Sequence, residues 1–210
     1  MFGIVNFEAF LLAGIVLNLT PGADTIYILG RSISQGKKSG ILSALGISTG
    51  ALIHCLFATL GLSILLAKSA IAFNIVKYTG VIYLIYLGIQ LIRSKTDKKF
   101  EIKRTCTSQI SNRKIYLSGI LTNVLNPKVA LFFLAFLPQF INPEFTDNYT
   151  PFLILGLTFV TTGTVWCLLL AFFASKLSDS IRRNYKIKSW LDTCTGGIFI
   201  LLGIKLAFTK

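Results

Sequence analysis

The sequence has 210 residues, of which 53 % are hydrophobic and only 14 % are charged. A soluble domain of this length needs more polar surface, and apolar runs of about 20 residues, the length that crosses a bilayer, recur along the whole chain. The net charge of +13 does not indicate a nucleic-acid-binding protein, because the basic residues fall in short segments between apolar runs. The composition therefore predicts an all-α integral membrane protein with a single transmembrane domain, residues 1–210.

Six apolar stretches predict six transmembrane helices. The first is expected to stay in the mature protein, because it lacks the basic flank and the cleavage pattern of a signal peptide. The four cysteines form no CxxC pair and are interpreted as small buried hydrophobic residues. The predicted spans are residues 6–30, 40–67, 70–92, 115–140, 150–175 and 190–208.

Lysine and arginine gather in alternate connections between these spans. The first, third and fifth connections are basic, whereas the fourth, INPEFTDNYT, has two acids and no base. Basic connections of membrane proteins face the cytoplasm, so both termini are predicted to lie outside. The long third connection, residues 93–114, is expected to be a solvated cytoplasmic loop near anionic lipid.

The two halves of the chain resemble each other. Gly14 begins GIVLNLTPG and Gly119 begins GILTNVLNPK, and aligning these glycines also aligns Asn18 with Asn123. The later stretches YTGVIYLIYLGIQL and CTGGIFILLGIKL match in the same order. Residues 6–92 and 115–208 are thus predicted to be two copies of a three-helix unit. Because three is odd, the second copy would enter the membrane from the opposite side, as in the inverted repeats of many secondary transporters.

Each copy carries a proline inside its first helix, Pro21 and Pro127. Proline removes a backbone hydrogen bond, and a side chain such as Thr20 or Asn126 directly before it is typical of a helix N-cap. Helices 1 and 4 are therefore predicted to be broken mid-membrane, with each second half beginning at its proline.

Exposed N–H groups at the two breaks would face one cavity and suit a carboxylate, and Asn18 and Asn123 could add their amides. Gly22 loosens the chain beside the first break. A carboxylate at bilayer depth usually has a role, so Asp24 is expected to bind a substrate ammonium or to carry a proton. Helix-end stabilisation is the simpler alternative for Asp24.

Two further charged or titratable side chains are candidates. Lys128 follows the second break and would either pair with Asp24 across the cavity or extend towards the membrane surface. His54 in the second helix would either relay a proton or contact substrate, or else bond to a neighbouring helix. With one histidine and eight acids in the chain, no catalytic residue, metal site or cofactor is predicted.

The residues argue against two other functions and leave a third open. A membrane thiol–disulfide electron carrier would need a cysteine beside each break, and neither break has one. An intramembrane enzyme would need a second embedded acid or a Ser–Lys pair. An importer or a channel of the same architecture stays possible, because the sequence does not fix the direction of transport.

The stretches NLTPGADTIYIL, RSISQGKKSGILSALGISTG and LTNVLNPKVALFFLAFLPQF resemble the LysE/RhtB family of bacterial amino-acid exporters, and the resemblance covers essentially the whole chain. It implies export of a small amino acid such as homoserine, threonine, leucine or lysine across the inner membrane, driven by protons. The scarcity of embedded acids favours a neutral substrate over lysine. A carrier this small could form a homodimer.

The resemblance also implies which residues are central. The chain departs from the family pattern at one position. Family members often have PGP at the first break, whereas this chain has Ala23 after Gly22, so a shallower break is expected there. The central elements implied by the resemblance are Pro21, Gly22, Asp24, Asn126, Pro127 and Lys128.

Overall fold

The computed structural model of the protein describes residues 2–62 and 111–183, together with isolated helical positions between 71 and 93 and between 193 and 204. The predicted third and sixth helices and most of the predicted basic loop lie outside the continuously described residues. Within the described part, regular structure is helical except for one antiparallel bridge between Ile4 and Ile141. The α-helices there are α1 (Phe7–Leu19), α2 (Ala23–Gln35), α3 (Lys37–Phe57), α6 (Asn112–Val124), α7 (Pro127–Leu131) and α8 (Tyr149–Arg183).

Short π and 3-10 segments extend two of these helices. The π-helix Ala58–Leu62 continues α3, and the π-helix Phe132–Phe136 followed by the 3-10 turn Leu137–Phe140 continues α7. A further 3-10 turn, Pro143–Phe145, precedes α8. The predicted fourth span is therefore α6, α7 and their extension, beginning three residues earlier than expected.

The prediction that helices 1 and 4 are broken is confirmed. The α1–α2 pair bends by 46° and the pair formed by α6 and residues 127–140 bends by 48°. The two breaks thus bend by similar angles, although the first has Ala23 in the place of a second proline. Pro127 occupies the first turn of α7 with Asn126 as its N-cap, as predicted.

At the first break the predicted capping was wrong. The second half-helix, α2, begins at Ala23 with Gly22 as its N-cap, two residues after Pro21. Thr20 instead ends α1, and its hydroxyl donates a hydrogen bond of 2.8 Å to Val16 O. The hydroxyl proton of this threonine is thus used within its own helix, an alternative always open to the residue.

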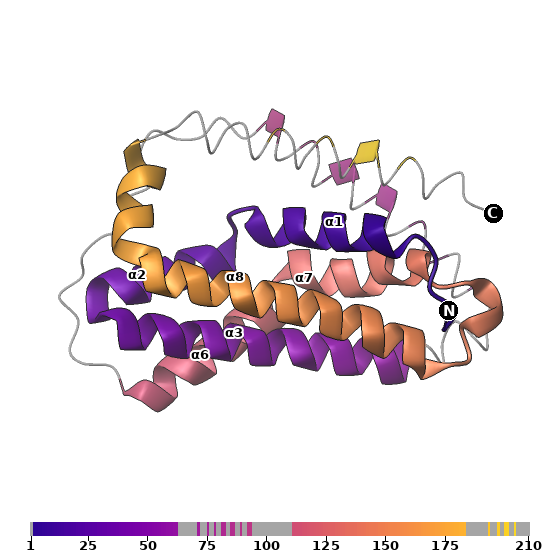
Figure 1. Ribbon diagram of the computed structural model, residues 1–210, viewed down its shortest axis with the longest axis horizontal. Helices are drawn as coiled ribbons and strands as arrows, with labels where there is room; N and C mark the ends of the chain where they lie inside the picture. The colour runs from indigo at the N-terminus through magenta and orange to yellow at the C-terminus, as the bar shows by residue number, and fades with distance from the viewer. Residues whose placement is uncertain are drawn as a thin grey trace.

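The two bent pairs run in opposite directions along the molecule. In Figure 1, α1 leads from the right end towards α2 at the left, whereas α6 starts at the left and leads through α7 to the right. The halves before the breaks, α1 and α6, have 13 residues each, and their bounds keep the spacing that separates Gly14 from Gly119. The α3 and α8 helices lie side by side along the long axis.

The described helices have the length and composition of membrane spans. Residues 37–61 and 149–174 are each long and apolar enough to cross a bilayer, and each bent pair qualifies when taken as one span. Large apolar side chains such as Leu12, Phe57 and Val165 are exposed on their outer faces, as expected for helices that contact lipid. The described residues thus contain two to four spans of the six predicted.

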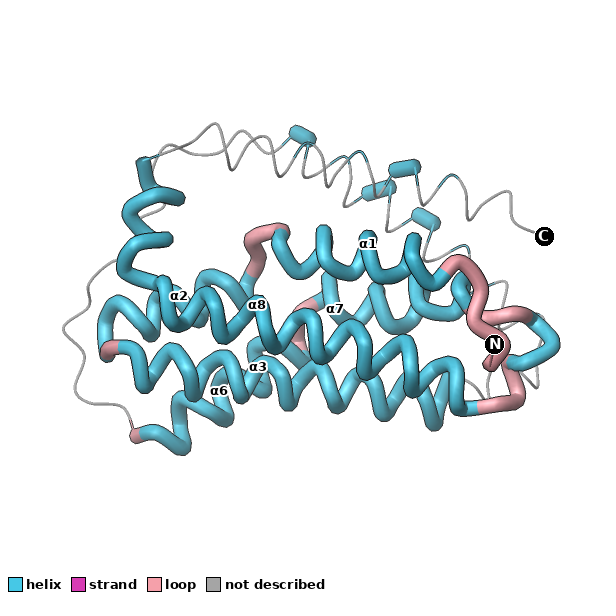
Figure 2. Tube along the Cα trace, viewed as in Figure 1, coloured by secondary structure: helices cyan, strands magenta, loops and turns pink. Residues whose placement is uncertain are grey.

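The N-terminal segment closes one end of the bundle. Val5 N–H donates to Phe140 O at 2.9 Å, and Asn142 N–H donates to Gly3 O at 2.8 Å. An aromatic cluster lies behind this contact, in which the ring of Phe10 is 5.3 Å from that of Phe140 and 5.7 Å from that of Phe132. Figure 2 shows the same segment as a loop that reaches the turn before α8. This packing holds the first helix against the second bent pair.

Candidate substrate and coupling site at the helix breaks

The two breaks lie next to each other and are joined by side chains. Asp24, in the first turn of α2, accepts hydrogen bonds on Oδ2 from Asn123 Nδ2 at 2.9 Å and from Asn126 Nδ2 at 3.1 Å. Both asparagines flank the second break, and their exposed fractions are only 2 % and 5 %. A carboxylate from the first repeat is therefore held by amides of the second.

Lys128 makes the opposite connection, from the second break to the first. Its Nζ donates to Leu17 O at 3.1 Å and to Thr20 O at 3.0 Å, the backbone carbonyls at the C-terminal end of α1. The end of a helix carries partial negative charge, and α1 has no basic residue of its own in its last turn. The ammonium from α7 thus supplies the positive charge that α1 lacks.

Two alternatives were predicted for Lys128, and the first, an ion pair with Asp24, is not formed. Both residues belong to the described part of the chain, and no ion pair joins them there, although each is within electrostatic reach of the other. The other prediction, extension towards the membrane surface, is also wrong, because Nζ stays at the break. Gly22 lies beside it, since a Cβ at that position would be 3.4 Å from Nζ, an ordinary van der Waals contact.

Proline explains which carbonyls are available. A proline lacks the N–H that would bond to the carbonyl four residues before it. Pro21 therefore leaves Leu17 O without its helical donor, and this carbonyl accepts from Lys128 Nζ. Pro127 likewise removes the helical donor of Asn123 O, which instead accepts from Asn126 N–H at 2.9 Å and lies 3.2 Å from His54 Nε2. Both carbonyls thus face a side chain from another helix that can carry positive charge.

His54 approaches the site from α3 without touching Asp24 directly. Its ring stacks on Phe133 with centroids 5.9 Å apart, and its Nε2 faces the backbone of Asn123. The predicted alternatives for His54 were a functional role or a bond to a neighbouring helix. The contact with α6 is such a bond, and it ends at the residue whose side chain holds Asp24.

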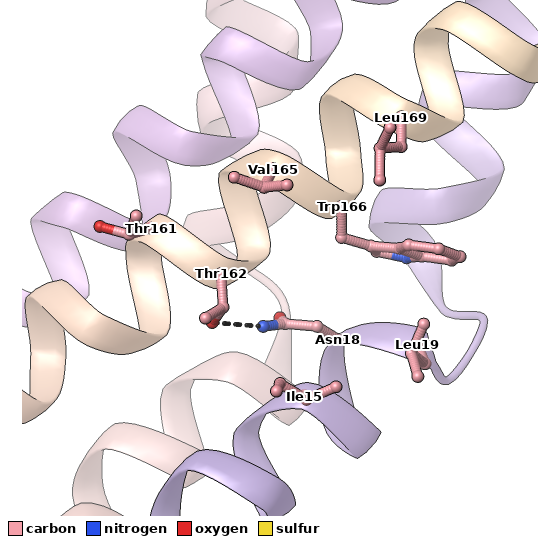
Figure 3. A pocket seen from close by; sticks show the side chains of 8 residues that line it. All are labelled: Ile15, Asn18, Leu19, Thr161, Thr162, Val165, Trp166 and Leu169. Carbon is pink, nitrogen blue, oxygen red and sulfur yellow. Dashed lines mark hydrogen bonds between the residues drawn. The ribbon is translucent and has the colours of Figure 1, made fainter.

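Asn18 is not part of this group. It corresponds to Asn123 in the repeat, but its Nδ2 donates to Thr162 Oγ1 in α8 at 3.3 Å. Figure 3 shows Asn18 and Thr162 facing each other across a pocket between α1 and α8. The amides of Asn18 and Asn123 therefore lie in different surroundings, and the predicted role of Asn18 in binding a substrate carboxylate stays a prediction.

That pocket is mostly apolar and has a volume of about 300 Å³. Its polar groups are the Asn18 amide and the hydroxyls of two threonines, and the indole Nε1 of Trp166, on its wall, is buried without a hydrogen-bond partner. Trp166 points towards Leu19 and Asn18 in Figure 3. The lining residues are Ile15, Asn18, Leu19, Thr161, Thr162, Val165, Trp166 and Leu169. The pocket adjoins the last turn of α1, directly before the first break.

Two buried oxygens at the break have no hydrogen-bond partner, Asp24 Oδ1 and Asn123 Oδ1. Leaving a buried acceptor unpaired costs about 1–3 kcal/mol, and more for a charged group. Because Asp24 Oδ2 already accepts two amides, the second oxygen is the part of this carboxylate that remains available to a donor. A substrate ammonium or a proton would satisfy it.

Small residues let α3 approach the second break closely. A Cβ added to Gly50 would lie 2.7 Å from Asn123 Cβ and 2.9 Å from Ile120 O, and one added to Gly119 would lie 2.9 Å from Ser43 O. Gly46 has the same role, because a Cβ there would lie 3.1 Å from Gly119 Cα. Gly50 therefore provides the space in which Asn123 reaches Asp24.

The central contacts of Lys128 were not predicted from the sequence. The missing signal was the position four residues before each proline, which identifies Leu17 and Asn123 as the residues whose carbonyls lose their helical N–H donor. Which side chain reaches those carbonyls depends on how the two repeats face each other.

The described residues contain no cluster of three or more His, Cys, Asp or Glu side chains that could hold a metal ion.

Comparison with known proteins finds similarity along nearly the whole chain. The profile of the LysE type translocators matches residues 15–210. The chain is 33 % identical over 202 residues to a homoserine/homoserine lactone efflux protein of Salmonella typhimurium, covering 96 % of each chain. It is also 32 % identical to an uncharacterized membrane protein of Vibrio cholerae, covering 96 % of each, and 33 % identical to the uncharacterized membrane protein YrhP of Bacillus subtilis, covering 89 % of this chain and 91 % of that one. No solved structure matches the chain.

Proposed function

The chain belongs to the family of LysE type translocators, and from this premise we propose that it exports a small, neutral amino acid across the bacterial inner membrane in exchange for protons. It is a membrane transporter and not an enzyme. The observation that carries the proposal is the pair of facing helix breaks, which places a carboxylate, an ammonium and two amides inside an otherwise apolar bundle.

The substrate would bind at the first break. Its ammonium would meet Asp24 Oδ1, the buried carboxylate oxygen that has no partner. Its carboxylate would lie at the start of α2, where Gly22 offers no capping side chain and the backbone N–H groups of the first turn point out of the helix. In this arrangement, the break binds the part of the substrate that all amino acids share.

The side chain of the substrate would extend into the apolar pocket between α1 and α8. A volume of about 300 Å³ is at the lower end of the range for ligand sites. The lining carries hydroxyl and amide groups but no charge, which supports a neutral side chain, polar or aliphatic, over a cationic one. The efflux protein of Salmonella typhimurium is named for homoserine and homoserine lactone, and homoserine is the first substrate to test.

The fold proposed for the whole chain is two inverted repeats of three helices, residues 6–92 and 115–208. The opposite directions and the similar bends of the two described helix pairs support it. Alternating access would then consist of one repeat rocking against the other around the breaks. The reciprocal bonds of Asp24 and Lys128 would be broken and remade in that motion.

The proposed orientation has both termini outside the cell. The ends of α2 and α8 and the starts of α3 and α6 gather at the left end of Figure 1, and the N-terminus and the turn before α8 lie at the right. The segments at the left end carry basic residues, and the turn at the right end carries two acids and no base. Positive charge on the cytoplasmic side supports this orientation.

Exchange of labelled amino acids across proteoliposomes tests the function directly. Vesicles containing the purified protein are loaded with unlabelled homoserine, and entry of labelled homoserine is followed against empty vesicles. We expect exchange with homoserine and weaker exchange with lysine. If lysine exchanges as well as homoserine, the assignment to neutral substrates is wrong; if no amino acid exchanges, the exporter assignment itself is wrong.

A further inference from the structure

A second role for the break residues follows from the surroundings of the Lys128 ammonium. In carriers with broken helices, unwound carbonyls and the C-terminal ends of half-helices commonly hold the coupling cation. Here the corresponding groups are Leu17 O and Thr20 O, and both accept hydrogen bonds from Lys128 Nζ, at 3.1 Å and 3.0 Å. The position that a metal cation would occupy in a cation-driven carrier is filled by a tethered ammonium.

We propose that Lys128 is the coupling group of the transporter and carries the exchanged proton on Nζ. This inference rests on the proposed function, because it assigns the proton of that exchange to one residue. A lysine amine can hold or release a proton, whereas a guanidinium stays charged under all conditions of transport. The chemistry is therefore within reach of Lys128 and of few other side chains at the breaks.

The proton step makes and breaks only N–H bonds. Facing outward, the neutral amine takes a proton from external water and becomes an ammonium that binds the α1 carbonyls. Facing the cytoplasm, the ammonium returns that proton to water and becomes a neutral amine with a free electron pair. One positive charge thus enters with each cycle as the substrate leaves, without a metal cation.

The contact geometry explains how protonation would control the break. As an ammonium, Lys128 offers three N–H donors and a charge to carbonyls whose partial charge is negative. Loss of the proton removes the charge and one donor, and the link between α7 and the end of α1 weakens. Gly22, at the start of α2, lies beside Nζ, so the amine is next to the first break when the link opens.

The titratable groups around Lys128 come from two neighbouring helices. Asp24 in α2 and Cys167 in α8 are within electrostatic reach of the ammonium, and His54 in α3 is within reach of Asp24. Asp24 is engaged by Asn123 and Asn126 through Oδ2 and is assigned here to the substrate ammonium. The carboxylate and the amine therefore have separate tasks, one for binding and one for coupling.

Two substitutions separate these tasks in proteoliposomes. Lys128→Arg keeps the charge permanently, and Lys128→Gln imitates the neutral amine. Each is measured in two ways: homoserine exchange without a gradient, and homoserine transport driven by an imposed pH gradient. Lys114→Arg, an exposed lysine in the first turn of α6, is the matched control.

We expect both Lys128 variants to lose gradient-driven accumulation, while homoserine exchange without a gradient stays above that of empty vesicles. Gradient-driven accumulation by either variant would overturn the proposal. Absence of the Gln variant from the membrane would also overturn it, because a proton carrier must tolerate its own neutral form. If the wild-type protein itself exchanges no amino acid, the proposed function is wrong. If the wild-type protein exchanges homoserine and a Lys128 variant still accumulates it along the pH gradient, only the assignment of Lys128 is wrong.

Discussion

Asp24 and Lys128 each bind to the opposite helix break, and they do not pair with each other in the described structure. The carboxylate accepts from Asn123 and Asn126 beside the second break, and the ammonium donates to the end of α1 beside the first. Two opposite charges are thus used to tie two inverted helix pairs together.

Asp24→Asn is expected to weaken substrate binding while leaving the protein in the membrane. The amide has the same shape, and its oxygen can keep both bonds from the asparagines, but its NH2 group cannot accept from a substrate ammonium as the second carboxylate oxygen can. Hydrogen bonds to charged groups contribute about 1.5–3 kcal/mol, so homoserine exchange should fall by about tenfold to a hundredfold. Initial exchange rates in proteoliposomes measure this. Exchange at the wild-type rate would remove Asp24 from the substrate site.

Asn126→Ala is expected to lower both stability and transport. It removes the N-cap of α7, where Oδ1 accepts from Lys128 N–H at 3.1 Å, and one of the two amides on Asp24. Loss of an N-cap costs about 1 kcal/mol. Thermal unfolding in detergent and homoserine exchange are measured together.

Asn142→Ala is the matched control for this cap. Asn142 also caps a helical turn, accepting from Glu144 N–H at 3.1 Å, but it lies away from the breaks. It should leave exchange unchanged. Equal transport defects in the two variants would mean that Asn126 acts through general stability alone.

Gly50→Ala is expected to separate α3 from α6. The added methyl group would lie 2.7 Å from Asn123 Cβ and 2.9 Å from a backbone carbonyl, which cannot move aside as a flexible side chain can. Overpacking of this kind costs about 1–3 kcal/mol. Gly30→Ala in α2 is the control, because no atom would lie within 4 Å of its new Cβ. A Gly50 variant as stable and active as the Gly30 variant would contradict the close approach of the two helices.

The orientation predicts which end of the bundle a membrane-impermeant maleimide can reach. In a background without the native cysteines, Asp147→Cys should react in intact cells, and Lys38→Cys should react only after the membrane is opened. Both positions are exposed. The reverse labelling pattern would place the termini in the cytoplasm and invert the proposed direction of the repeats.

The sequence was sufficient to predict the breaks, because proline acts locally and its effect on the backbone is known. Pro127 with Asn126 predicted both the position and the cap of α7. The start of α2 could not be predicted as well, since Thr20 had two possible hydrogen bonds and formed the one within its own helix. Local chemistry left that choice open.

The partners of the charges depended on tertiary structure. Asn18 and Asn123 occupy equivalent places in the repeat, yet one faces α8 and the other faces Asp24. Lys128 reaches carbonyls that are more than a hundred residues away in sequence. These contacts depend on how the two halves of the chain pack against each other, and the spacing of residues along the sequence does not specify that packing.

The most direct test of proton-coupled export is efflux from proteoliposomes loaded with labelled homoserine, threonine, leucine or lysine. The internal pH is held constant while the external pH is neutral or acidic. Because an inward proton gradient should drive substrate outward, the account predicts faster efflux of the neutral amino acids at acidic external pH, and little efflux of lysine. Efflux that ignores the gradient, or that does not exceed the leak from empty liposomes, would contradict it.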